Sequence, residues 1–194
     1  MRRPYSATER ERTERLPGDE FVPHPRTGYT LGLTIRAVPS EIWPWLVQMG
    51  QGRGGFYTHE WVETLLGAHI QNVDRIVPAW QHLELEDTIR LTPDPYLGQP
   101  GQFATVADIW PLRALVFRQT MPNGTVGTWA FALRPLPDGS TRLLLRRRSG
   151  GASIFDRVMW PGYLYMDRGM LHGLRERAEA MARPEVPTLP GAVI

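Results

Sequence analysis

The sequence contains no cysteine, which excludes disulfide bonds and thiolate metal sites. Chains without disulfides are typical of reducing compartments, so we expect the protein in the cytoplasm. No hydrophobic run approaches the roughly 18 residues of a membrane-spanning helix, and stable membrane insertion is therefore not expected. The arginine-rich start of the chain is followed by no hydrophobic segment, so we expect no secretory signal.

Motifs for metals, nucleotides and nucleic acids are also missing. The five histidines form no HxxxH or HExxH pair, so neither a metal site nor a cofactor is expected. Gly50, Gly52 and Gly55 spell GxGxxG, but a dinucleotide site needs a strand before this motif, and here a helix is predicted. We interpret these glycines as a sharp turn. Acidic and basic residues are interspersed and the net charge is only +2, so nucleic acid is not an expected partner.

The chain is rich in aromatic side chains, with seven Trp, six Tyr and six Phe among 194 residues. Its 42% hydrophobic content is that of a globular protein, and its length fits one domain of ordinary size. We expect a polar N-terminal arm over residues 1–27, a single domain over 28–182 and a proline-rich tail over 183–194. Residues 6–15 could form a helical turn or two, although a loosely ordered arm is the main expectation.

Alternation of apolar and polar residues predicts a run of strands. Residues 28–37 alternate in the manner of a half-buried strand. The other predicted strands cover residues 87–91, 102–110, 113–120, 125–134 and 140–148. Pro-Asn-Gly at 122–124 and Pro-Asp-Gly at 137–139 are turn sequences, and strands joined by such turns pair antiparallel.

Apolar residues at spacings of three and four predict helices. Two short helices are expected after the first strand, at about residues 40–49 and 58–67. A long helix is expected over 154–182, with Asp167 on its solvated face and a kink or break at Pro161–Gly162. The predicted fold class is α+β, an antiparallel sheet with its helices on one face.

Several segments of the sequence resemble one large group of proteins. They are Pro39, Glu41, Ile42, Trp43, Trp45 and Leu46, then MGQGRGGFYTHEWVETLLG, then DRIVPAWQHLELEDTI, and finally MDRGMLHGLRERAEA. In this order they resemble the SRPBCC superfamily, which includes START lipid-transfer domains, birch-pollen allergens and polyketide cyclases. The resemblance is closest to the bacterial polyketide cyclase/dehydrase and lipid-transport group, and it covers about residues 28–182.

The resemblance implies a helix-grip fold, in which a curved antiparallel sheet of about six to seven strands wraps around a long C-terminal helix. It also implies an internal cavity that binds a small hydrophobic or amphipathic molecule, lipid- or polyketide-like. One alternative is a cyclase or dehydratase that uses the same cavity. Another is a structural or interaction protein with a filled core, which a pocket below about 300 Å³ would favour. The sequence does not decide between a monomer and a homodimer.

The candidate lining residues are aromatic side chains and methionines on predicted inward faces. They are Trp43, Trp61, Trp80, Phe103, Phe117, Trp129, Phe131, Met159, Tyr163, Met166 and Met170. Trp129 and Phe131 rank first, because they lie on the inward side of a central strand. Each of these side chains could equally be ordinary core.

Arg147 and Asp108 are the charged candidates. Alternation through residues 140–148 places Arg147 inward and leaves Arg146 and Arg148 facing water. A buried guanidinium keeps its proton and needs a partner. Asp108, in an otherwise apolar strand, could be that partner in a structural ion pair. Alternatively, Arg147 could hold a ligand carboxylate or polarise a carbonyl group, as catalysis would require.

Overall fold

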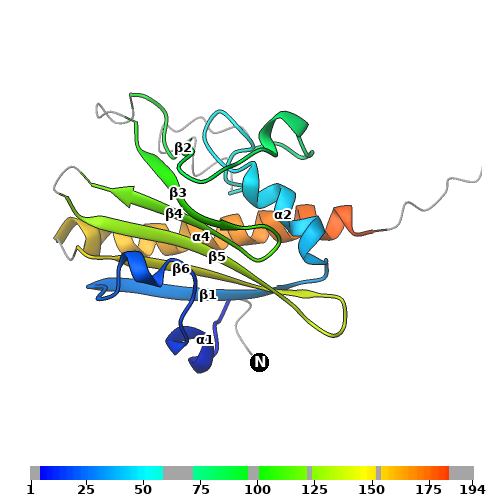
Figure 1. Cartoon of the computed structure of the whole chain (residues 1–194), viewed down its shortest axis with the longest axis horizontal. Coiled ribbons are helices and arrows are strands. Elements are labelled where there is room, and N and C mark those ends of the chain that lie inside the picture. The colour runs from blue at the N-terminus through cyan, green and yellow to red at the C-terminus, as the bar shows by residue number, and fades with distance from the viewer. Residues whose placement is uncertain (1–4, 59–71, 96–100, 122–123, 152–153, 184–194) are drawn as a thin grey trace, which may run out of the picture.

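The computed structural model describes residues 5–58, 72–95, 101–121, 124–151 and 154–183, with the backbone alone over 154–160. Within these ranges, one antiparallel sheet curves around a long helix, as Figure 1 shows. The predicted α+β class is confirmed. None of the helices in these ranges combines the length and hydrophobicity needed to cross a bilayer.

Six strands form the sheet. They are β1 (Thr27–Ile35), β2 (Thr88–Arg90), β3 (Phe103–Trp110), β4 (Ala114–Thr120), β5 (Val126–Pro135) and β6 (Thr141–Ser149). Their spatial order is β1-β6-β5-β4-β3-β2, and every neighbouring pair is antiparallel. Consecutive strands from β2 to β6 therefore lie side by side, whereas β1 closes the far edge beside β6.

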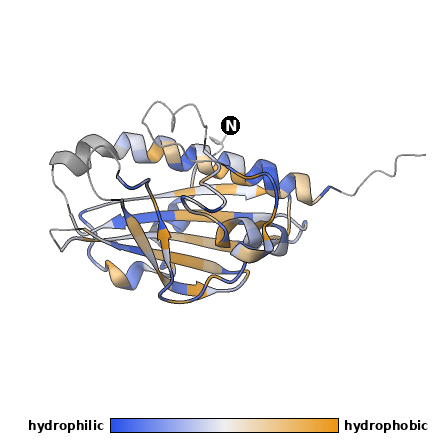
Figure 2. Ribbon diagram, turned by 90° about the horizontal axis from the view of Figure 1, so that it is seen from above, coloured by the Kyte–Doolittle hydropathy of each residue, from blue (hydrophilic) through white to orange (hydrophobic). Residues whose placement is uncertain are grey.

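Cross-strand rows of apolar side chains build the core on the concave face of the sheet. Leu31, Leu145, Phe131 and Leu115 are successive Cα partners across β1, β6, β5 and β4, and all four are buried. Because strand side chains alternate between faces, the strand periodicity alone brings these four together. Figure 2 shows the hydrophobic segments of the strands and α4 lying across the sheet.

Helix α2 (Pro39–Val47) follows β1. Pro39 occupies its first position, where a missing N–H costs nothing, and the Glu41 carboxylate accepts the Val38 N–H at 2.8 Å. A turn with positive φ at Gly50, Gly52 and Gly55 comes next, which confirms the interpretation of the glycines. The second short helix was predicted at residues that fall mostly in 59–71, outside the described ranges.

Helix α4 (Ile154–Met181) spans 28 residues and packs on the concave face. Of the predicted kink or break, the break is wrong, because the helix continues through Pro161 and Gly162. Both residues are exposed, so water can replace the hydrogen bond that proline is unable to make. After them, the buried side chains of Met170, Leu171 and Leu174 anchor the helix to the sheet.

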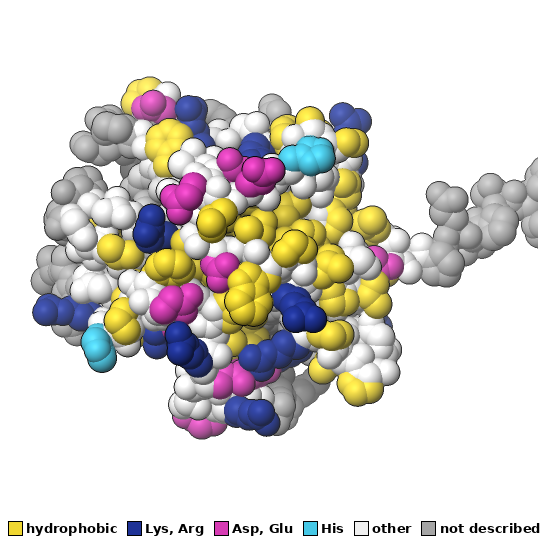
Figure 3. Space-filling view, in the orientation of Figure 1, with side chains coloured by type: hydrophobic (Ala, Val, Ile, Leu, Met, Phe, Trp, Pro, Cys, Tyr) yellow, Lys and Arg dark blue, Asp and Glu magenta, His cyan; other side chains and the backbone are white. Residues whose placement is uncertain are grey.

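Residues 5–26 form a second layer on the convex face, with α1 (Glu9–Thr13) and the 3₁₀ turn η1 (Asp19–Phe21). Arginines from β5 and β6 hold this layer, pairing Arg142 with Glu11 at 2.8 Å and Arg146 with Asp19 at 2.7 Å. The expected loose arm and water-facing Arg146 are therefore wrong. Figure 3 shows this side of the molecule, with acidic and basic side chains interspersed around a hydrophobic middle.

Candidate ligand-binding site

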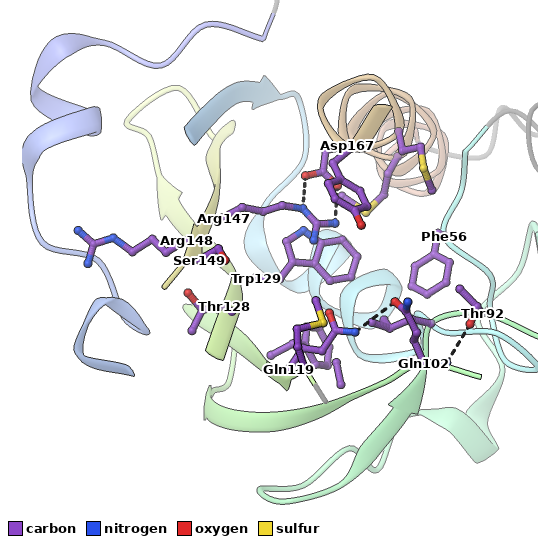
Figure 4. Close-up of a pocket in the computed structure, with 18 of the residues that line it drawn as sticks. Phe56, Thr92, Gln102, Gln119, Thr128, Trp129, Arg147, Arg148, Ser149 and Asp167 are labelled. Carbon is purple, nitrogen blue, oxygen red and sulfur yellow. Dashed lines mark hydrogen bonds and ion pairs between the residues drawn. The ribbon is translucent and has the colours of Figure 1, made fainter. Parts of the chain in front are cut away.

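A cavity of about 180 Å³ lies between the sheet and α4. Its wall includes aromatic and thioether side chains: Phe56 from the loop after α2, Phe117 and Trp129 from the sheet, and Tyr163, Met166 and Met170 from α4. Figure 4 shows Phe56 and Trp129 next to each other in this wall, with ring centres 6.0 Å apart. The packing of a helix across a curved sheet thus leaves a hollow that apolar side chains line.

One cross-strand row supplies the polar chemistry of this cavity. Tyr29, Arg147, Trp129 and Phe117 are successive Cα partners across β1, β6, β5 and β4. This group, the site row, lies two residues along each strand from the all-apolar row described above. The same alternation that builds the core therefore also places a guanidinium and a phenol beside the cavity.

Asp167 of α4 is the partner of Arg147. The guanidinium donates two hydrogen bonds to this carboxylate, from Nε at 2.6 Å and from Nη2 at 2.9 Å. The hydroxyl of Tyr29 donates a third, at 2.6 Å. The Asp167 side chain is only 2% exposed, whereas that of Arg147 is 26% exposed. A two-pronged pair of this kind fixes the orientation of the guanidinium plane.

Both members of the site row that can titrate keep their protons. Burial raises the pKa of Tyr29, and the neighbouring Asp167 carboxylate raises it further, so the hydroxyl stays a donor. Burial alone lowers the pKa of Arg147, but the charge of Asp167 and the hydrogen bonds to it raise that pKa above its usual value. The guanidinium carbon also lies 4.5 Å from the ring centre of Trp129, within cation–π range.

Arg147 retains hydrogen-bonding capacity. A guanidinium carries five N–H groups, and Asp167 accepts two of those on Arg147. Asp167 accepts from Nε and Nη2 and not from Nη1, and the Arg147 side chain is partly exposed. Nε1 of Trp129 is buried and also without an acceptor in the described ranges. The cavity wall therefore presents this buried donor and the donors of Arg147 that Asp167 does not use.

A second polar group lies at a more exposed part of the wall. The side chains of Gln102 and Gln119 are joined by a hydrogen bond of 3.2 Å, and the hydroxyl of Thr92 accepts the backbone N–H of Gln102 at 2.9 Å. Figure 4 shows these residues across the cavity from the Arg147–Asp167 pair, with Trp129 between. The cavity thus has a charged, mostly buried end and an uncharged, exposed one.

The loop that carries Phe56 is fixed on both sides. The side-chain oxygen of Asn72 accepts the backbone N–H groups of Phe56 at 3.1 Å and Tyr57 at 2.6 Å. Tyr57 has a φ of 58°, which is uncommon for a residue with a side chain. Its carbonyl approaches α4 at Gly173, where any Cβ would overlap it. These contacts hold Phe56 against the cavity.

Six of the predicted candidates line the cavity, namely Phe117, Trp129, Arg147, Tyr163, Met166 and Met170. Phe131 lies in the core behind Trp129, with ring centres 4.9 Å apart. Trp43 and Trp80 are half-buried and do not line it, and Phe103 is exposed beneath Arg90. Trp61 and the side chain of Met159 fall outside the described part of the chain.

The predicted pair between Asp108 and Arg147 is wrong, because Asp108 lies on the other face of the sheet. An irregularity in β3 between Val106 and Asp108 interrupts the alternation. Asp108 is the Cα partner of Val116, whose side chain packs close to Gly18 in the N-terminal layer. Val106 is buried opposite Phe117, and one extra residue reverses the side for Asp108.

Sequence reasoning missed Asp167 and Phe56 as cavity residues, and it missed Tyr29 as the hydroxyl that donates to Asp167. Asp167 was expected on the solvated face of the long helix and is instead buried. Its position was available from helical spacing, since it follows Tyr163 by four residues and precedes Leu171 by four. Among the described residues, no three His, Asp or Glu side chains come together as a metal site would require.

A comparison with models of protein families finds no match, and neither does one with curated protein sequences. Solved structures are similar to this chain. Protein MLL2253 from Mesorhizobium loti is 16% identical, with 79% of this chain and 98% of that chain covered and a TM-score of 0.51. Protein NE0264 from Nitrosomonas europaea is 11% identical, with 79% and 94% covered and a TM-score of 0.50.

The Aha1 dimer from Colwellia psychrerythraea is 15% identical, with 79% of this chain and 96% of that chain covered and a TM-score of 0.45. Identities this low relate folds and carry no information about ligands or reactions. The chain therefore shares its α+β architecture with MLL2253 and NE0264, and that architecture is consistent with a helix-grip fold.

Proposed function

We propose that the protein binds a small hydrophobic or amphipathic molecule in the cavity between the sheet and α4. The observation that carries this proposal is the cavity of about 180 Å³, walled by aromatic side chains and by a partly exposed guanidinium. An apolar cavity of roughly 150 Å³ is large enough to bind benzene. A ligand with one ring or a short chain therefore fits better than a whole lipid or a multi-ring polyketide.

Simple energetics support binding at this scale. Burying about 100 Å² of apolar ligand surface contributes roughly 2.5 kcal/mol. A hydrogen bond to a charged donor such as Arg147 adds roughly 1.5–3 kcal/mol. Membership of the SRPBCC superfamily is part of the proposal, and the strand order and the long C-terminal helix support it.

The hydrogen bonding of Asp167 favours binding over catalysis. A cyclase or dehydratase needs a group that exchanges a proton with its substrate. The Asp167 carboxylate is 2% exposed and already accepts hydrogen bonds from two N–H groups of Arg147 and from Tyr29. A carboxylate held in this way is better suited to orienting Arg147 than to serving as a base.

A second candidate function is that of a structural or interaction protein with a filled core. The small volume favours it, because sites for drug-sized ligands range from about 300 to 1,000 Å³. The two candidates differ in what the purified protein does with apolar compounds. A binding protein takes them up at one site, whereas a protein with a filled core does not.

Native mass spectrometry of freshly purified protein, followed by titration with an apolar fluorescent probe, tests the proposal. We expect one bound small molecule per chain or one saturable probe site. Trp129→Ala should weaken probe binding, because it removes the central wall of the cavity. Trp110→Ala, at a tryptophan that is 51% exposed on β3, is the matched control and should leave binding unchanged. An unchanged affinity in folded Trp129→Ala would contradict the proposal.

The remaining proposals concern compartment and assembly. We propose a cytoplasmic location, which the absence of cysteine supports. A small molecule is the proposed partner, and nucleic acid is not, since the basic strand β6 directs its outer arginines into ion pairs with the N-terminal layer. Size-exclusion chromatography with light scattering decides between a monomer and a homodimer.

A further inference from the structure

The charge balance of the cavity narrows the chemical class of the ligand, given the proposed function. Among the described residues, three charged ones line it: Arg147, Asp167 and Arg148. Arg148 directs its guanidinium to the convex side, where it bonds the backbone carbonyls of Asp19 and Val22 at 3.1 and 3.0 Å. Figure 4 shows its side chain pointing away from the cavity. Arg147 and Asp167 remain, and their formal charges cancel.

At the buried end of the cavity, the acceptor oxygens of Asp167 are already used, and the remaining hydrogen-bonding capacity is that of donors. Each oxygen of Asp167 already accepts a hydrogen bond, and Oδ2 accepts two. Asp167 does not use Nη1 of Arg147, and Nε1 of Trp129 is buried without an acceptor in the described part of the chain. A ligand placed here therefore meets donors that Asp167 does not use, and an acceptor on the ligand completes the site.

A carboxylate is the wrong acceptor for this position. The guanidinium attracts an anion, but the carboxylate of Asp167 lies on the other edge of the same guanidinium and repels it. Taking a carboxylate out of water also costs much more than taking out a carbonyl group. A neutral acceptor gains the hydrogen bond without either penalty.

We propose that the cavity selects a compact hydrophobic molecule whose polar group is an uncharged carbonyl. Its oxygen accepts a hydrogen bond from Nη1 of Arg147, and its ring or short chain lies among Phe56, Trp129 and Tyr163. Asp167 acts as a specificity-determining residue, because it neutralises the guanidinium while leaving its remaining donors open.

Three one-ring compounds of nearly equal size test this selectivity on the full wild-type chain. Acetophenone carries a carbonyl, isopropylbenzene has no polar atom, and benzoate is an anion at pH 7.5. Ligand-observed NMR titrations should give acetophenone about tenfold tighter binding than either of the others, as one charged hydrogen bond provides. Equal binding of all three, or tightest binding of benzoate, overturns the inference and leaves the proposed function standing. If none binds, both fail.

The variant Asp167→Asn sharpens the test. It keeps the shape and acceptor oxygen of the side chain but removes its charge, so the site becomes cationic. The affinity ratio of benzoate to acetophenone should then rise at least tenfold. Asp108→Asn, the same change on the convex face, is the control and should leave the ratio unchanged. A folded Asp167→Asn with an unchanged ratio contradicts the inference. If this variant does not fold, the wild-type series decides.

Discussion

Arg146 and Arg147 are neighbours on β6, and the sheet directs them to opposite faces. All five N–H groups of Arg146 have acceptors. These are the Thr30 hydroxyl, the Asp19 carboxylate and the backbone carbonyls of Glu14, Glu11 and Arg12. On Arg147, Asp167 accepts from two of the five. Arg146 is 4% exposed as a residue, and the Arg147 side chain is 26% exposed.

The difference separates a structural arginine from one that can bind. A buried guanidinium is costly unless its donors are matched, and the N-terminal layer together with Thr30 of β1 matches every donor of Arg146. The cavity beside Arg147 leaves donors open and room next to them. The sequence contains no lysine, so all 22 basic residues are arginines. Only the arginine fork makes this many directed hydrogen bonds, and an ammonium group could not replace it on either face.

Removing Arg146 gives the largest expected effect. Arg146→Met should lower the free energy of unfolding by about 3–5 kcal/mol, because it leaves the Asp19 carboxylate without its closest partner at 2.7 Å. Urea unfolding followed by circular dichroism measures the change. Arg113→Met, at an exposed turn, is the control and should stay within about 0.5 kcal/mol of wild type. A loss below 1 kcal/mol for Arg146→Met would show that the convex face is not locked as described.

Replacing each arginine together with its acidic partner should distinguish Arg147 from Arg146. Arg147→Met leaves Asp167 buried beside Tyr29 and should cost roughly 2–4 kcal/mol. Adding Asp167→Leu should restore most of that loss, since hydrophobic residues can replace a buried pair.

The equivalent double variant on the convex face is the comparison. In Arg146→Met with Asp19→Leu, three backbone carbonyls are still left without donors, so little stability should return. Unfolding free energies of the four variants complete the measurement. Equal recovery on both faces would remove the distinction between the two arginines.

The sequence predicted the concave face better than the convex one, for a physical reason. Period-two alternation places Phe117, Trp129 and Arg147 on one face without knowledge of distant contacts. The partner of Arg146 is Asp19, which lies 127 residues earlier in a polar segment without periodicity. Judged separately, the arginine-rich strand and the acidic N-terminal segment each look solvated. Only their pairing in space buries them.

Within the site, the errors also have local causes. Asp167 follows the helical spacing of the buried stripe, but its charge led to a solvated assignment. Asp108 follows the strand spacing, but the irregularity after Val106 moved it to the other face. Charge and periodicity gave opposite indications only at Asp167. At Asp167 the structure follows the periodicity, and at Asp108 a single extra residue overrides it.

Acid should loosen the convex layer and spare the cavity, which is the smallest expected effect. The hydrogen bond from Arg142, opposed by burial, lowers the pKa of Glu11 from 4.5 to about 2. A lowered pKa contributes stability above pH 4.5 that is lost as the pH falls toward 2. The stability difference between wild type and Glu11→Gln, a few tenths to about 1 kcal/mol, should therefore shrink over that range. Acetophenone affinity, corrected for the unfolded fraction, should not change between pH 7 and pH 5, since Arg147 stays charged. A constant stability difference from pH 5 to pH 2.5 would contradict this assignment.

A crystal structure of the full chain soaked with acetophenone tests the central claim most directly. The account predicts the ring among Phe56, Trp129 and Tyr163, with the carbonyl oxygen about 2.7–3.2 Å from Nη1 of Arg147. The Arg147–Asp167 pair should stay in place. A cavity that stays empty at saturating ligand, or a ligand whose oxygen points toward Gln102 and Gln119 instead, would contradict it.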